Sequence, residues 1–152
     1  MRQVYTYTSR VVNGETLSSD RIKSVATTVG GVTDTLSYTY DGNGNIETIS
    51  KNGTDIYKYT YDSLNELIAE CDYANGKKFV YQYDERGNIV ATVKLSLSFD
   101  SNNEEVTEFE SVTTAGYSSS SWSDLTSYYN NGGVTYDASG NPTSLDGASL
   151  QW

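Results

Sequence analysis

Apolar and polar residues alternate along much of the chain with the two-residue period of a β-strand. Three segments show the alternation most clearly, with one side formed by Leu36, Tyr38 and Tyr40, then Tyr57, Tyr59 and Tyr61, then Phe79, Tyr81 and Tyr83. The residues between them, such as Lys58, Thr60 and Gln82, are mostly polar. This pattern predicts an antiparallel sheet with one apolar face and one face in contact with solvent.

The segments that follow alternate in the same way. Their apolar positions are Leu67, Ala69, Cys71 and Tyr73, then Ile89, Ala91, Val93, Leu95, Leu97 and Phe99. We therefore expect these side chains to share the face of the tyrosines. An Asn-Gly pair within residues 74–77 predicts a hairpin turn between the second and third of these units.

A motif, Tyr-x-Tyr-Asp-x-x-Gly-Asn, explains the spacing of these strands. It reads YTYDGNGN from Tyr38, YTYDSLNE from Tyr59, YQYDERGN from Tyr81 and VTYDASGN from Val134, with a weaker copy, LSFDSNNE, that contains Phe99, Asp100 and Asn103. The second tyrosine recurs after 21 residues, from Tyr40 to Tyr61, and after 22, from Tyr61 to Tyr83. Tyr136 follows Tyr83 after 53 residues, about two periods plus an insertion. Such a period is typical of repeat architectures.

The end of each motif has the composition of a tight turn. Asp at the first turn position accepts hydrogen bonds from the backbone ahead of it, and Gly at the fourth adopts a left-handed conformation, which predicts a hairpin with a bulge. In the second copy Asn65 replaces this Gly, and Asn tolerates that conformation best among the other residues. We assign a structural role to Tyr38, Tyr40, Asp41, Gly44, Asn45, Tyr59, Tyr61, Asp62, Asn65, Tyr81, Tyr83, Asp84, Gly87, Asn88, Tyr136, Asp137, Gly140 and Asn141.

These patterns divide the chain into four parts. Residues 1–37 are leading strands with a weak repeat match, 38–99 are repeats, 100–133 are a degenerate repeat with an irregular segment, and 134–152 are a last, truncated repeat. Within the irregular segment, Trp122, Leu125 and Tyr129 fit one face of a short helix with Ser121 as its cap. We expect roughly eight to ten strands in total from the repeat period, in a fragment of a longer chain.

Composition and charge argue against several classes of function. The chain has 152 residues, among them 14 Tyr, 13 Gly and a single Pro, which favours strands and turns. Its net charge of −10 argues against binding of nucleic acid or a polybasic membrane anchor. No apolar run approaches the roughly 20 residues of a membrane helix, and no signal peptide is visible. With one cysteine, the chain forms no internal disulfide.

No residue pattern predicts catalytic, cofactor-binding or metal-binding residues. The chain has no His, which removes the usual Ser-His-Asp and Cys-His arrangements, and Cys71 lies at an apolar strand position. The run DGNGN from Asp41 begins like a calcium loop, but Ile46 and Asn52 stand where such a loop needs Gly and Glu. The motif carboxylates recur because each turn needs one. A catalytic pair of acids needs two different environments to separate their pKa values, and a repeated environment argues against that. We expect no enzyme activity.

The copies from Tyr38, Tyr59, Tyr81 and Tyr136 resemble the motif of the YD-repeat, or Rhs (rearrangement hot spot), family, and the resemblance covers residues 38–152 well. The tail VTYDASGNPTSLDGASLQW looks like segments of wall-associated Gram-positive members. The resemblance implies a spiralling, hollow β-shell that encloses a toxin domain in polymorphic toxins and toxin complexes, and that serves adhesion in teneurins. The self-cleaving segment that ends many of these shells has no counterpart here, because no Asp-Pro pair occurs.

The residues and the resemblance together predict an all-β fold, a curved antiparallel β-hairpin meander of YD repeats that forms a segment of a spiral β-shell. The expected function is a non-catalytic structural segment of a secreted or surface bacterial protein that encloses or presents a toxin or effector domain. The alternative is a carbohydrate-binding cell-surface module, because tyrosines stack on sugars.

The expected partners are the rest of the parent repeat array or an enclosed C-terminal toxin domain. If the chain is instead a carbohydrate-binding module, glycans are the expected partners. No cofactor and no nucleic acid are expected. The Tyr-lined face needs a cover. Either the irregular segment, with Trp122, Leu125 and Tyr128, folds back over it, or a homodimer forms through a sheet edge or through this face.

Overall fold

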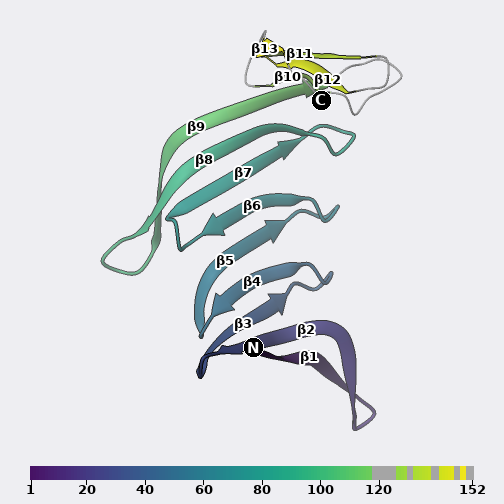
Figure 1. Cartoon of the computed structure of the whole chain (residues 1–152), viewed down its shortest axis with the longest axis vertical. Helices are drawn as coiled ribbons and strands as arrows, with labels where there is room; N and C mark the ends of the chain where they lie inside the picture. Colours follow the sequence, from purple (N-terminus) through teal and green to yellow (C-terminus); the bar gives the residue numbers. More distant parts are fainter. Residues whose placement is uncertain (118–125, 130–131, 138–140, 146–147, 150–152) are drawn as a thin grey trace. The chain divides into compact units, whose positions relative to one another are not determined.

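The computed structural model describes residues 1–117, 126–129, 132–137, 141–145 and 148–149. These residues form thirteen strands and no helix, so the predicted all-β antiparallel meander is confirmed (Figure 1). The chain divides into two compact units, residues 1–76 and residues 77–152, and we describe each by itself. No described helix is long and apolar enough to cross a membrane.

The first unit is a meander in which each strand pairs antiparallel with the next along the chain. Its strands are β1 (Arg2–Val12), β2 (Glu15–Val29), β3 (Val32–Tyr40), β4 (Ile46–Lys51), β5 (Thr54–Tyr61) and β6 (Leu67–Asp72). The turns after β3 and β5 are the Asp turns of the first two motif copies.

The second unit continues the same scheme from β7 to β13. Its strands are β7 (Lys77–Tyr83), β8 (Ile89–Phe99), β9 (Glu105–Tyr117), β10 (Thr126–Tyr129), β11 (Gly132–Tyr136), β12 (Pro142–Leu145) and β13 (Ala148–Ser149). Figure 1 shows that β9 bends strongly along its length.

Nine of the thirteen described strands, β1 to β9, match the predicted eight to ten, and four strands of two to five residues follow them. The predicted helix is wrong where the structure tests it. Tyr129 belongs to β10, which pairs with β9 and β11 and so extends the sheet. Strands of two to four residues, such as β10, β12 and β13, are too short to show an alternation in sequence. Ser121, Trp122 and Leu125 lie outside the described residues.

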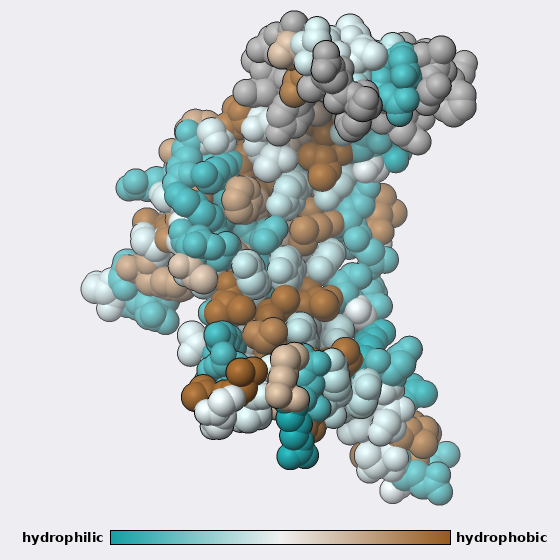
Figure 2. Space-filling view, viewed as in Figure 1, coloured by the Kyte–Doolittle hydropathy of each residue, from teal (hydrophilic) through white to brown (hydrophobic). Residues whose placement is uncertain are grey.

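Very few described side chains are buried. Cys71, Leu97 and Ala115 are the only buried hydrophobic residues of the described chain, and each unit is a single layer of strands. Apolar side chains therefore reach the surface among polar ones, as Figure 2 shows, and Phe109 is 66% exposed. The described parts of residues 100–133 extend the sheet edge and do not cover its face. The predicted homodimer stays a prediction.

In the first unit, the tyrosines of the outgoing strands β3 and β5 share one face, as expected. Residues directly opposite in an antiparallel pair lie on the same face, and Tyr38 faces Ile49, which in turn faces Tyr57. Tyr59 and Tyr61 lie opposite Glu70 and Leu67.

The prediction for the return strands is wrong for the residues of β6 and β8 beyond the first of each. Where the turns of Asp41, Asp62, Asp84 and Asp137 lead into the next strand, the described pairing skips Glu47, Ile68, Val90 and Thr143 respectively, each an extra residue of a β-bulge. One extra residue moves every later side chain to the opposite face. Leu67 and Ile89 therefore face the tyrosines, whereas the residues on the other face are Ala69, Cys71, Ala91, Val93, Leu95, Leu97 and Phe99.

The face opposite the tyrosines differs between the units. In the first unit it carries hydroxyl pairs, such as Thr39 with Thr48 at 2.7 Å and Thr6 with Ser24 at 2.7 Å. In the second unit it carries an apolar row in which Val80, Val93 and Val112 lie opposite one another. The expected polar side is thus clearest in the strands of the first unit before β6, where Ala69 and Cys71 interrupt it. In the second unit it is replaced by the valine row over β7 to β9 and recurs at the hydrogen-bonded Thr135 and Ser144.

Candidate functional site

The turn after β3 shows what the motif aspartate does. The Asp41 Oδ1 atom accepts hydrogen bonds from the backbone N–H groups of Asn43, Gly44 and Asn45 at 2.9, 2.7 and 2.8 Å. Its Oδ2 atom accepts a further bond from Asn45 Nδ2 at 3.0 Å. The backbone N–H of Asp41 donates to the Asn45 carbonyl at 2.9 Å, and Gly44 has a φ of 96°. A single carboxylate thus organises the whole reversal.

The same main-chain bond, from the aspartate N–H to the carbonyl four residues on, recurs in the other copies. It is formed at Asp62, Asp84, Asp100 and Asp137 at 2.9–3.0 Å, so the weaker copy at Asp100 is also an Asp turn. The fourth turn position has φ values of 65°, 81° and 62° at Asn65, Gly87 and Asn103. Asn88 and Asn141 donate to the second carboxylate oxygen as Asn45 does. Gly140 lies outside the described residues.

Hydrogen bonds to the charged form of a carboxyl group lower its pKa. The side-chain amide of Asn45 contributes most to the lowered pKa of Asp41, and that of Asn88 contributes most to the lowered pKa of Asp84. In the weaker copy, the backbone N–H of Glu104 is the main cause of the lowered pKa of Asp100.

Side-chain contacts also join one repeat to the next. Asn65 Oδ1 accepts hydrogen bonds from Asn43 Nδ2 and from Asn45 Nδ2, each at 2.9 Å. Asn65, which replaces Gly in the second turn, therefore links the second turn to the first by hydrogen bonds. Partial burial raises the pKa of Tyr61, and the negative charge of Asp41 in the preceding repeat adds to that increase.

The tyrosines of the motif pack within the sheet surface. All described motif tyrosines are partly buried. The rings of Tyr57 and Tyr59 stack with centroids 6.1 Å apart and an interplanar angle of 16°, and partial burial followed by the charge of Glu70 raises the pKa of Tyr59. The Tyr40 hydroxyl donates to the Ile22 carbonyl at 2.7 Å. The Tyr57 and Tyr59 rings and the Tyr40 hydroxyl therefore contact other groups of the same chain.

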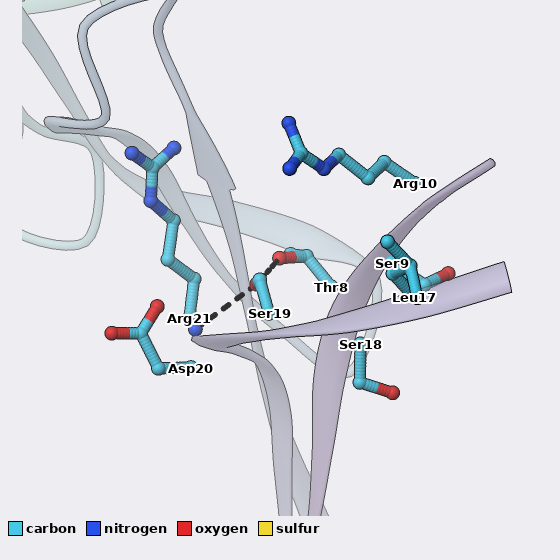
Figure 3. A pocket seen from close by; sticks show the side chains of 8 residues that line it. All are labelled: Thr8, Ser9, Arg10, Leu17, Ser18, Ser19, Asp20 and Arg21. Atoms are coloured by element: carbon cyan, nitrogen blue, oxygen red, sulfur yellow. Dashed lines mark hydrogen bonds between the residues drawn. The ribbon is translucent and has the colours of Figure 1, made fainter. Parts of the chain in front are cut away.

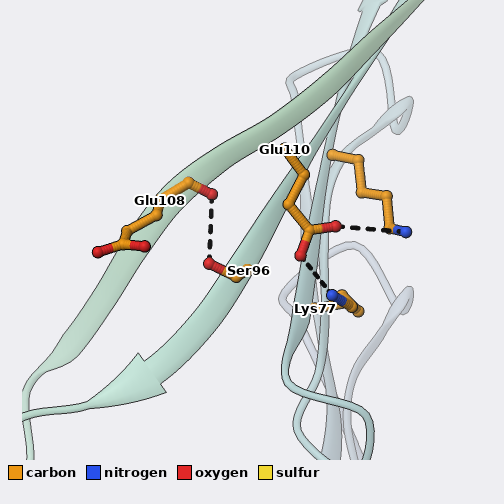
Figure 4. A network of polar contacts seen from close by, with 5 residues as sticks. Lys77, Ser96, Glu108 and Glu110 are labelled. Carbon is orange, nitrogen blue, oxygen red and sulfur yellow. Dashed lines mark hydrogen bonds and ion pairs between the residues drawn. The ribbon is translucent and has the colours of Figure 1, made fainter.

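A network of charged residues joins three strands of the second unit (Figure 4). Glu110 forms ion pairs with Lys77 from β7 and with Lys94 from β8, the latter at 3.3 Å. Lys77, followed by Lys94, lowers the pKa of Glu110. Because Glu110 is the extra residue of a bulge in β9, the bulge directs its carboxylate toward both lysines.

A groove in the β1–β2 hairpin was not anticipated from the sequence. It has a volume of about 570 Å³ and is lined by Thr8, Ser9, Arg10, Leu17, Ser18, Ser19, Asp20 and Arg21. The guanidinium groups of Arg10 and Arg21 extend on the same side of the hydrogen-bonded Thr8 and Ser19 hydroxyls (Figure 3). The only sequence signal is a polar stretch, residues 18–21, within an otherwise ordinary strand pattern.

The chain matches the family model of the teneurin YD-shell over residues 15–138, from the start of β2 to the turn after β11. It belongs to the YD-shell family. The match includes β2 and β3, so the family likeness begins earlier than residue 38, where the sequence alone placed it. A search of curated proteins found no match.

YD-shell membership agrees with the geometry of the motif residues, which lie in turns and on strand faces. The described motif aspartates are separated along the turns of successive hairpins, and no described group of three or more His, Cys, Asp or Glu side chains could hold a metal ion. Both oxygens of the Asp41 carboxylate already accept hydrogen bonds. Cys71 is 5% exposed.

Proposed function

We propose that the chain is a non-catalytic structural segment of a YD-repeat β-shell in a secreted or surface-displayed bacterial protein. In that protein the shell encloses or presents a toxin or effector domain. The observation that supports this proposal best is the recurrence of one Asp turn at five described positions, in a chain that belongs to the YD-shell family.

The sheet surface supports an enclosing role. The described chain buries few side chains, and partly buried tyrosines and aliphatic residues form extended surfaces. A sheet of this kind gains stability when further repeats extend its edges and a cargo contacts its face. The extracellular or surface location is inferred from the family alone.

The motif residues support a structural role. A catalytic carboxyl pair requires environments that push the two pKa values apart, whereas hydrogen bonding lowers the pKa of Asp41, Asp84 and Asp100 alike. Each of these carboxylates is engaged by its own turn. The stacked tyrosines are likewise occupied by neighbouring groups, which favours packing over binding of neutral sugars at this face.

Limited proteolysis of the parent protein, with its flanking repeats and C-terminal region, tests the proposal. We expect the C-terminal domain to resist trypsin in the native protein and to be digested at least about tenfold faster in an Asp62→Ala variant, because that turn and its link to the preceding repeat open. Ser63→Ala, an exposed change in the same turn, is the matched control. Equal digestion of the C-terminal domain in all three proteins would overturn the enclosing role.

A further inference from the structure

The groove in the β1–β2 hairpin results from an irregularity in strand pairing. Tyr7 pairs with Ile22 and Ser9 pairs with Ser18, so the single residue Thr8 lies opposite three residues, Ser19, Asp20 and Arg21. Two extra residues on β2 force the strands apart and bend the hairpin. Ser19 stabilises the opening, because its hydroxyl bonds to that of Thr8 and accepts the Arg21 N–H at 3.1 Å.

The groove brings two arginines together near the N-terminus of a strongly acidic chain. Four of the ten Lys and Arg residues, Arg2, Arg10, Arg21 and Lys23, lie within the first 23 positions, although the net charge is −10. Among the described residues, Arg10 and Arg21 take part in none of the ion pairs. Two guanidinium groups, four hydroxyl side chains and one carboxylate, that of Asp20, thus line one recess, in which the two arginines outnumber the single acid. Guanidinium is the side chain best matched to planar oxyanions.

A second cavity adjoins the first through Thr8, Ser9 and Arg21, which line both. Its volume is about 430 Å³, and its other lining residues are Tyr7, Lys23, Tyr38, Thr39, Tyr40 and Asp41. Tyr40 is already occupied, because Arg21 lies over its ring at 5.6 Å and its hydroxyl is bonded to Ile22. Tyr7, which is 50% exposed, presents an aromatic surface beside the cationic groove.

We propose that the two adjoining cavities bind a short acidic oligosaccharide. Its carboxylate or phosphate oxygens lie between Arg10 and Arg21, its hydroxyl groups bond to the serine and threonine side chains, and a sugar ring packs on Tyr7. The combined site has the size range of small-molecule pockets and the aromatic-plus-polar lining that sugar recognition needs. The net charge of −10 disfavours long polyanions such as nucleic acid but leaves a short, locally held anion in place. This site is independent of the proposed shell function.

Titration calorimetry on the whole chain tests the site with three probes: trigalacturonic acid, a glycerol phosphate trimer and the neutral maltotriose. Arg10→Gln is the informative variant, because Arg10 forms none of the described hydrogen bonds or ion pairs and the fold is expected to tolerate its loss. Arg2→Gln removes the same charge from the same strand but lies outside both cavities, so it is the matched control.

We expect at least one acidic probe to bind, with an affinity that falls about tenfold in Arg10→Gln and less than twofold in Arg2→Gln. Affinity should fall as salt is raised from 50 to 300 mM, because salt screens exposed charges. Stronger binding of the galacturonate than of the phosphate trimer assigns the carboxylate as the ligand group, and the reverse order assigns the phosphate. Binding of maltotriose as strong as that of both acidic probes, equal losses in the two variants, or no binding of any probe at millimolar concentration would each overturn the proposal.

Discussion

An Asp84→Asn variant is expected to unfold at a temperature about 5 °C lower than the native chain. The Asn Oδ1 atom can still accept the backbone N–H bonds of Arg86 and Asn88, each of which measures 2.9 Å in the native turn. The new amide nitrogen, however, faces the Asn88 amide nitrogen, which donates to Asp84 Oδ2 at 3.0 Å. Two donors then face each other, and the charge that strengthens all these bonds is gone. Thermal unfolding followed by circular dichroism measures the change.

A reciprocal exchange separates this cause from a simple loss of charge. In Asp84→Asn/Asn88→Asp the amide donates to the new carboxylate, so the side-chain bond is restored in the opposite direction and part of the loss should be recovered. Glu85→Gln removes one charge from the same turn and should leave the midpoint within about 1 °C. If Glu85→Gln lowered the midpoint as much as Asp84→Asn, net charge and not the turn would be the cause.

Gly44→Ala is expected to destabilise the chain by about 1–2 kcal/mol. Its φ of 96° is unfavourable for any residue with a Cβ. The added Cβ would also lie 2.1 Å from an Arg21 guanidinium nitrogen, so that side chain must leave its place over the Tyr40 ring. Urea unfolding gives the free energy directly.

Substitutions at two other glycines separate the cost of backbone strain from the cost of the contact with Arg21. Gly53→Ala meets the same backbone strain at a φ of 86° with no atom within 4 Å of the new Cβ, whereas Gly42→Ala meets neither strain nor contact. We expect the cost to decrease from Gly44→Ala to Gly53→Ala to Gly42→Ala, and the excess at Gly44 to disappear in an Arg21→Ala background. Equal costs at Gly42 and Gly44 would show that the left-handed conformation is not required.

The turns and outgoing strands could be predicted because their physical causes are local. An aspartate followed three positions later by Gly or Asn specifies the reversal through its own hydrogen bonds, as at Asp41 and Asp62. The alternation of Tyr57, Tyr59 and polar neighbours specifies the face in the same local way. Even the weaker copy at Asp100 forms the turn, because Asn103 adopts the required φ of 62°.

The faces of the return strands and the groove could not be predicted, because they depend on pairing between strands. A bulge at Ile68 places Cys71 opposite Lys58 on the face away from Tyr59, although simple alternation places it with the tyrosines. In the same way, the opening beside Thr8 exists only because three residues of β2 lie opposite one residue of β1. Periodicity along one strand carries no information about such two-strand features.

A carbon-detected NMR titration of the aspartate carboxyl groups tests most directly whether the repeated motif aspartates build the turns of this meander. In the folded chain we expect Asp41, Asp84 and Asp100 each to titrate with a lower pKa than in the urea-unfolded chain, because turn N–H and amide groups bond to their charged forms. Folded-state pKa values below the unfolded ones mean that their stabilisation is present above the unfolded pKa and is lost as the pH falls through the folded pKa. If the three groups titrated at the same pH in the folded and unfolded chains, the turns would not depend on these carboxylates, and the repeated aspartates would not be what builds the meander.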